Sequence, residues 1–189
     1  MKYTDLIIKN NIHYCSSNDK PYTGNIEGEI KGYMIDGRLE GIWIEYFEDG
    51  KVNSQINYKY GEMRGEYNIY YKSGNLKEKG YVINGKWEGE LLNYYDNGNI
   101  KQKKIFIKGK LNGECLFYFK SGKIKEKKNY LSDKLHGTFI CYHNNGVTWI
   151  KSNYDAGLLE GKREVFCEKG EIKKIEFYKK GFKKGKPLH

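Results

Sequence analysis

The sequence predicts an all-β protein: an elongated, single-layer, twisted antiparallel meander of β-hairpin repeats with no or minimal helix. Three observations predict it. Glycines recur with a fixed period of 24 residues, aromatic and aliphatic residues keep the same period, and Asp-Gly, Ser-Gly or Asn-Gly pairs separate β-prone runs. No window has the 3.6-residue apolar period of an amphipathic helix.

The repeat is defined by three glycine series in constant phase. Their first members are Gly37, Gly41 and Gly50, and Asp133 fills the one vacancy in the first series. Between the glycines, side chains of one type recur at the same period. Four such columns, which begin at Leu39, Tyr46, Val52 and Tyr58, are predicted to form the buried ladder of the sheet.

Both junctions of each unit are predicted to be turns. Pairs such as Asn97-Gly98 between β-prone runs are the strongest short-range signal for a hairpin. At the other junction, as in Asn84-Gly85, glycine supplies the positive φ that a tight turn needs. Asp133 is an acceptable substitute, because Asp adopts positive φ more readily than most residues.

The repeats divide the chain into three parts. Residues 1–20 are expected to form a capping hairpin with Asn10-Asn11 as its turn. Residues 21–185 form one continuous repeat array, and residues 186–189 form a C-terminal tail.

Composition restricts the class of protein. Lys plus Arg number 34 against 24 Asp plus Glu, a formal net charge of +10. Aromatic residues, at 15%, are too frequent for a disordered chain. No apolar run approaches the roughly 18 to 20 residues of a membrane span, and the N-terminus lacks the features of a secretory signal. We expect a basic, soluble, cytoplasmic protein.

No catalytic, metal or cofactor site is predicted. Cys15, Cys115, Cys141 and Cys167 form no C-x-x-C pair and have no histidine at ligand spacing. The segment 157–162 is one residue short of a phosphate-binding loop and lacks the following Ser or Thr. No nucleophile and base can be assigned. We therefore expect a protein that is not an enzyme and needs no cofactor.

Lysines form the one regularity that the fold does not require. Two columns, two residues apart on the second strand of each unit, share one face of the predicted sheet because side chains alternate with period 2. They comprise Lys77, Lys101, Lys125 and Lys173, and Lys79, Lys103, Lys127 and Lys151. Two interpretations stay open: a solvating surface that discourages edge pairing, or an electrostatic footprint for an acidic partner.

Some aromatic residues stand outside the predicted ladder. They are candidates for exposed contacts with a partner, since Tyr and Trp contribute large contact area at low entropic cost. These residues are Trp43, Tyr67, Tyr71, Tyr95 and Trp149.

The repeat resembles the MORN repeat, specifically the bacterial variant found in antitoxin-like proteins. The resemblance runs from Tyr22 to Gly185 and rests on the phased pattern G-x-x-x-G followed by an aromatic, a glycine, an aliphatic and a second aromatic. It departs from the pattern at Asp133, Thr148 and Arg163-Glu164. The resemblance implies a glycine-punctuated β-meander with binding or scaffolding roles, and no kinase activity.

The leading hypothesis is a non-enzymatic binding protein that engages another protein, expected to be acidic, through one face of its sheet. Neutralisation of that partner, as by an antitoxin or immunity protein, is implied by the resemblance alone. The alternative is a basic module that binds anionic phospholipid or nucleic acid. Few arginines and no amphipathic helix or lipidation motif favour the protein partner. Self-association through an end strand stays open.

Overall fold

The computed structural model describes residues 1–185, and the expected tail at 186–189 lies outside them. The predicted all-β meander is confirmed: the described chain consists of antiparallel strands and one 3-10 turn, η1, at Tyr3–Asp5. No helix among the described residues is long and apolar enough to span a membrane.

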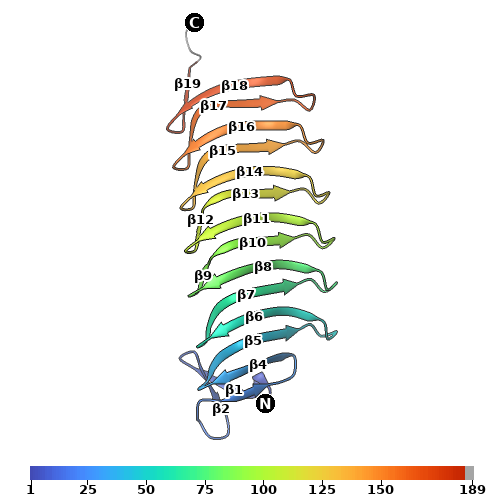
Figure 1. The fold of residues 1–189 in the computed structure, drawn as a ribbon, viewed down its shortest axis with the longest axis vertical. Coiled ribbons are helices and arrows are strands. Elements are labelled where there is room, and N and C mark those ends of the chain that lie inside the picture. Colours follow the sequence, from blue (N-terminus) through green and yellow to red (C-terminus); the bar gives the residue numbers. More distant parts are fainter. Residues whose placement is uncertain (186–189) are drawn as a thin grey trace. The chain divides into compact units, whose positions relative to one another are not determined.

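Contacts group the chain into two compact units, residues 1–88 (unit 1) and the residues from 89 on (unit 2). The boundary falls inside the array expected over 21–185. In each unit, strands joined by a tight turn or a hairpin loop lie side by side and antiparallel (Figure 1). The strands β1 (Leu6–Lys9) and β2 (Ile12–Cys15) form a separate hairpin.

The strand bounds follow the repeat. Unit 1 contains β1 (Leu6–Lys9), β2 (Ile12–Cys15), β3 (Gly24–Ile26), β4 (Ile30–Ile35), β5 (Arg38–Tyr46), β6 (Val52–Lys59), β7 (Glu62–Tyr70), β8 (Leu76–Ile83) and β9 (Lys86–Trp87). Unit 2 contains β10 (Gly89–Tyr94), β11 (Ile100–Ile107), β12 (Lys110–Leu111), β13 (Gly113–Tyr118), β14 (Ile124–Leu131), β15 (Lys134–Tyr142), β16 (Thr148–Asp155), β17 (Leu158–Phe166), β18 (Ile172–Lys179) and β19 (Phe182–Lys184).

Two kinds of turn join the strands, as predicted. The tight turns have two central residues at positive φ, as at Asn84 (50°) and Gly85 (69°). Asp133 adopts φ 69° in the equivalent turn, so it does substitute for glycine. The other loops, such as the one between β5 and β6, have a glycine with positive φ three residues after the residue that opens the turn. At Gly50, for example, the backbone N–H donates to the carbonyl of Phe47 at 2.9 Å.

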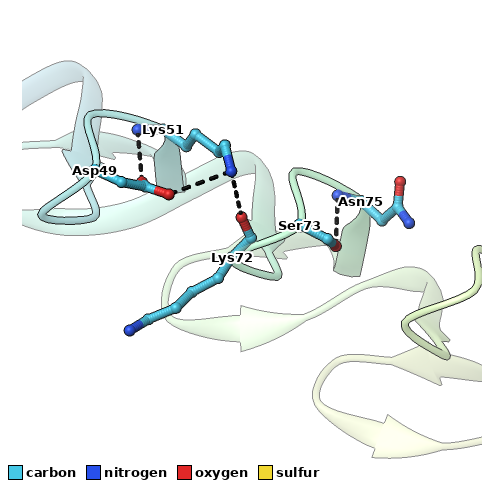
Figure 2. Close-up of polar contacts among 5 residues, drawn as sticks. All are labelled: Asp49, Lys51, Lys72, Ser73 and Asn75. Carbon is cyan, nitrogen blue, oxygen red and sulfur yellow. Dashed lines mark hydrogen bonds and ion pairs between the residues drawn. The ribbon is translucent and has the colours of Figure 1, made fainter.

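In unit 1, the loops that contain Gly50 and Gly74 contact one another through polar groups (Figure 2). The Lys51 ammonium lies 3.2 Å from the Asp49 carboxylate and donates to the backbone carbonyl of Lys72 at 3.1 Å. The hydrogen bond from the backbone N–H of Lys51, followed by the Lys51 ammonium, lowers the pKa of Asp49. Lys51 thus links the loops of consecutive hairpins.

The glycine series that begins at Gly41 produces β-bulges. Gly65 has φ 103° inside β7. Ile56 pairs with Tyr67 and Tyr58 with Met63, so three residues of β7 lie opposite one residue of β6. Such bulges bend a strand and increase its local twist.

One face of the sheet in each unit, which we call the core face, carries the most buried side chains. At intervals of 24 residues they are Trp43 and Tyr67 in unit 1, and Leu91 and Cys115 in unit 2, all at most 8% exposed. The four columns predicted as the buried ladder are mostly half-buried instead. A single-layer sheet has no second layer to cover them completely.

The N-terminal hairpin covers the core face at the start of unit 1. Tyr3 packs edge-on against Trp43, with ring centroids 6.0 Å apart. The buried His13 ring donates from Nδ1 to the carbonyl oxygen of Gly37 at 2.9 Å and accepts the Tyr3 hydroxyl at Nε2, also at 2.9 Å. These contacts close the cluster around Met34, which is fully buried.

Near the end of unit 2, charged side chains replace the apolar ones on the core face. The Glu176 carboxylate, 5% exposed, contacts Arg163 at 2.6 Å, Lys174 at 2.8 Å and Lys183 at 2.9 Å. Hydrogen bonds from Lys174 and Lys183, and then from Arg163, lower the pKa of Glu176 to about 2 against the opposing effect of desolvation. Glu176 therefore links β17, β18 and β19 electrostatically.

Candidate partner-binding surface

The strand register places six of the predicted lysines on one face of unit 2, opposite the core face. Lys103 pairs with Leu116, Leu116 with Lys127, and Lys127 with Ile140, which pairs with Lys151. Directly paired residues share a face, and so do residues two apart on a strand. Lys101, Lys125 and Lys173 therefore join this surface, which we call the lysine face.

Lysines and aliphatic residues alternate across the lysine face from β11 to β16. Beyond β16, Lys151 pairs with Glu164, whose carboxylate contacts Lys162, and Glu164 pairs with Ile175, two residues from Lys173. Leu116 and Ile140 are half-buried between lysines on the neighbouring strands. Because adjacent strands lie about 4.8 Å apart, lysines on every second strand stand roughly 9 to 10 Å apart. Lysine stems can cover the aliphatic side chains while the ammonium groups reach solvent.

The predicted lysines differ in how they are compensated. In unit 1, Lys79 lies 3.8 Å from Glu66, and the Lys77 ammonium lies 5.8 Å from the centre of the Tyr71 ring. In unit 2, Lys103 forms an ion pair with Glu90.

Lys101 in unit 2 is compensated in the same way as Lys77, since its ammonium lies 5.8 Å from the Tyr95 ring. By contrast, no carboxylate in residues 1–185 forms an ion pair with Lys125, Lys127, Lys151 or Lys173. Lys127 is half-buried and the other three are exposed. We call these four the unpaired lysines.

Two of the aromatic candidates were predicted wrongly as exposed. Trp43 is 5% exposed and Tyr67 is 2% exposed, and both pack on the core face. Each ring lies over a strand glycine, Trp43 over Gly32 and Tyr67 over Gly80. A glycine without a side chain leaves room for an aromatic ring on the neighbouring strand, which explains the burial.

The remaining aromatic candidates lie nearer the surface. Tyr71 in unit 1 and Tyr95 in unit 2 are half-buried. The Tyr95 hydroxyl donates to the backbone carbonyl of Tyr118 at 2.8 Å, so this side chain links consecutive hairpins. Trp149 is 45% exposed and stands on the lysine face.

Trp149 borders a hollow of about 380 Å³ in unit 2. Phe119 and His143 also line it, with Lys125 and Glu168 at its edges. The His143 and Trp149 rings lie 5.7 Å apart at an angle of 36°. No sequence column singled out this hollow, although Trp149 itself was a candidate.

The fold defines a class of protein: a module of β-hairpin repeats, here with one lysine-rich face in unit 2. The family model described as "MORN repeat variant" matches residues 39–60, 63–84, 87–108, 111–131 and 135–156, more than half of the chain. The chain belongs to this family. MORN repeats are in general non-catalytic modules that bind membranes or proteins. No curated protein matches the sequence.

Proposed function

We propose that this protein is a non-enzymatic binding protein that engages an acidic surface of another protein through its lysine face. The observation that carries the proposal is the set of unpaired lysines. A lysine that already contacts a carboxylate gains little from a second one, whereas an uncompensated lysine on an open face attracts acidic groups and accelerates their encounter.

The mode of action would be occlusion. A sheet built from repeats covers the partner, lysines steer the approach, and half-buried aliphatic side chains such as Leu116 and Ile140 contribute apolar contact. We further propose that the partner is neutralised by being covered, as by an antitoxin or immunity protein in the cytoplasm. This finer proposal is supported only by the resemblance to antitoxin-like proteins. A small toxin-like reading frame beside the gene would support it.

The test is affinity capture with two charge-matched variants. In the first, glutamate replaces each unpaired lysine, at Lys125, Lys127, Lys151 and Lys173. In the control, glutamate replaces four exposed lysines that lie outside the strands and so outside the lysine face, at Lys2, Lys20, Lys72 and Lys180. The proposal predicts that one stoichiometric partner is lost with the first variant and retained with the control. Equal capture by both folded variants contradicts it.

Salt dependence separates the protein partner from the alternative ligands. Contacts to nucleic acid phosphates lose orders of magnitude in affinity between about 50 and 200 mM salt, without sequence preference. Sedimentation with phosphatidylserine vesicles reports anionic lipid in the same way, since each lysine near such a surface contributes about 1 kcal/mol. Strong vesicle or DNA binding in the absence of a protein partner would assign the lysine face to these ligands instead.

A further inference from the structure

The repeat changes at several positions on the lysine face of unit 2, among them Glu164 and Ile175, and two other changes lie side by side. Trp149 stands in the column that holds Lys101 and Lys125. His143 stands in the column that holds Tyr95 and Phe119. Departures from an otherwise regular pattern are expected where a protein functions. Both departures meet at the hollow bordered by Trp149.

The walls of this hollow are held in place. The His143 ring donates from Nε2 to the carbonyl oxygen of Phe166 at 3.1 Å, the same link to the next hairpin that Tyr95 makes in its own repeat. Trp149 packs against this fixed ring. The Asn145 side chain donates to the backbone carbonyl of Glu168 at 2.9 Å, which holds the loop on the other side.

The size and lining of the hollow indicate what it can hold. Its volume of about 380 Å³ lies at the lower end of the roughly 300 to 1,000 Å³ that ligand pockets span. Phe119 and Trp149 offer apolar ring surface. One large apolar side chain suits such a site, and exposed tryptophans in pockets are frequent centres of binding energy in protein interfaces.

Charge around the hollow is unequal. Lys125 lines the hollow. On the same face, Lys127 lies two residues after Lys125 on β14, and Lys151 lies two residues after Trp149 on β16. Glu168 lies at the edge formed by the loop. An occupant therefore meets positive charge on the strand side and negative charge on the loop side, so its acidic residues are directed along the strands.

We propose that this hollow is an anchor site for an acidic segment of a protein partner. The segment places one leucine or phenylalanine side chain against Trp149 and Phe119, and its carboxylates pair with Lys125, Lys127 and Lys151. The inference rests on the proposed function and specifies which part of the lysine face discriminates between partners. Nucleic acid fits less well, because base stacking along a strand uses successive exposed aromatic residues. Of the aromatic rings that line the hollow, Trp149 is exposed, whereas Phe119, Tyr142 and His143 are half-buried.

Three probes and one variant test the proposal. The probes are a hexapeptide of four glutamates followed by leucine and phenylalanine, the same peptide ending in two glycines, and hexadeoxythymidylate. Nitrogen-15 NMR resolves the indole N–H groups of Trp43, Trp87 and Trp149, the three tryptophans of the chain. The matched variant is Trp149→Lys, which restores the lysine of the neighbouring repeats and so keeps the fold.

The proposal predicts that the Leu-Phe peptide shifts the Trp149 indole signal and binds at least about tenfold more tightly than the glycine peptide, a difference of about 1.4 kcal/mol. In Trp149→Lys the two peptides bind equally. Equal binding to the unmodified protein overturns the anchor and leaves the proposed function standing. Binding of neither peptide overturns both. A tighter complex with hexadeoxythymidylate, shifting the Trp149 signal, assigns the hollow to nucleic acid and also overturns the proposal.

Discussion

Replacement of Gly80 by alanine tests the packing of the core face in unit 1. A Cβ atom at residue 80 would lie 2.6 Å from Cε1 and 2.8 Å from the hydroxyl oxygen of Tyr67, so the ring must move. Overpacking of this kind costs about 1 to 3 kcal/mol, offset by about 0.4 to 1 kcal/mol because alanine restricts the unfolded chain. We expect a net loss of about 1 to 2 kcal/mol.

The loss of stability is larger if the displaced Tyr67 ring also loses its hydrogen bond to Glu78. The Tyr67 hydroxyl donates to the Glu78 carboxylate at 2.7 Å, and this bond, together with burial as the larger cause, raises the pKa of Tyr67. Breaking a hydrogen bond to a charged group adds about 1.5 to 3 kcal/mol. Tyr67→Phe removes the hydroxyl alone and measures this contribution separately.

Urea unfolding followed by circular dichroism measures the change in the free energy of unfolding. Thermal unfolding should show a fall in Tm of about 2 to 4 °C for each kcal/mol. Gly80→Ala combined with Tyr67→Leu is the control, because a smaller side chain at residue 67 should accommodate the new methyl group. The double variant should therefore lose less than the sum of the single changes. If Gly80→Ala is as stable as the unmodified protein, the proposed packing of Tyr67 on Gly80 is wrong.

Three further predictions concern the two ends and one turn. The pKa of Glu176 in the folded protein, about 2, is below its ordinary value of 4.5, so its stabilising contribution is complete above pH 4.5 and is lost as pH falls towards 2. Acid titration of Glu176→Gln should lack this component, and an unchanged titration curve would contradict the prediction. Removal of residues 1–20 should expose Met34 and Trp43, giving increased binding of a hydrophobic dye and red-shifted tryptophan emission, and unchanged spectra would count against it. Asp133→Ala should cost about 1.5 to 3 kcal/mol in thermal unfolding, because alanine at φ 69° is strained and the hydrogen bond that the backbone N–H of Leu111 donates to the Asp133 carboxylate is lost. Asp133→Gly should cost less, and the reverse order would refute this account of the turn.

The turns and strand order could be predicted from the sequence because each depends on local conformation. A positive-φ position selects Gly, Asn or Asp wherever it recurs, so the series through Gly85 and Asp133 is visible in one chain. The β-bulges correspond to an equally regular glycine series that begins at Gly41. A glycine inside a strand, however, does not by itself distinguish a bulge from a close approach of another backbone.

Burial on the core face could not be predicted, because its central column does not keep one residue type. Trp43, Tyr67, Leu91 and Cys115 succeed one another at intervals of 24 residues. In the last repeat, 48 residues after Cys115, the same column holds Arg163. Burial there depends on what lies across the strand, as Gly80 lies beneath Tyr67. A glycine off the repeat lattice, such as Gly80, is the signal that could have identified this packing.

Alternation along the strands predicted that the lysines share one face, but whether each lysine forms an ion pair depends on the neighbouring strands. Lys103 is compensated by Glu90 across β10 and β11, whereas Lys127 faces the aliphatic residues Leu116 and Ile140. Because these neighbours lie on adjacent strands, only the register distinguishes the unpaired lysines from the paired ones. The hollow beside Trp149 also depends on three separate segments of the chain.

Lysine acetylation footprinting, read by mass spectrometry on the free protein and on its captured complex, tests most directly whether the lysine face binds the partner. We expect Lys125, Lys127, Lys151 and Lys173 to react several-fold more slowly in the complex. The exposed lysines outside the lysine face, at Lys2, Lys20, Lys72 and Lys180, should react at the same rate in both states. Unchanged reactivity of the four unpaired lysines, with protection confined to the lysines outside the face, would contradict the proposed binding surface.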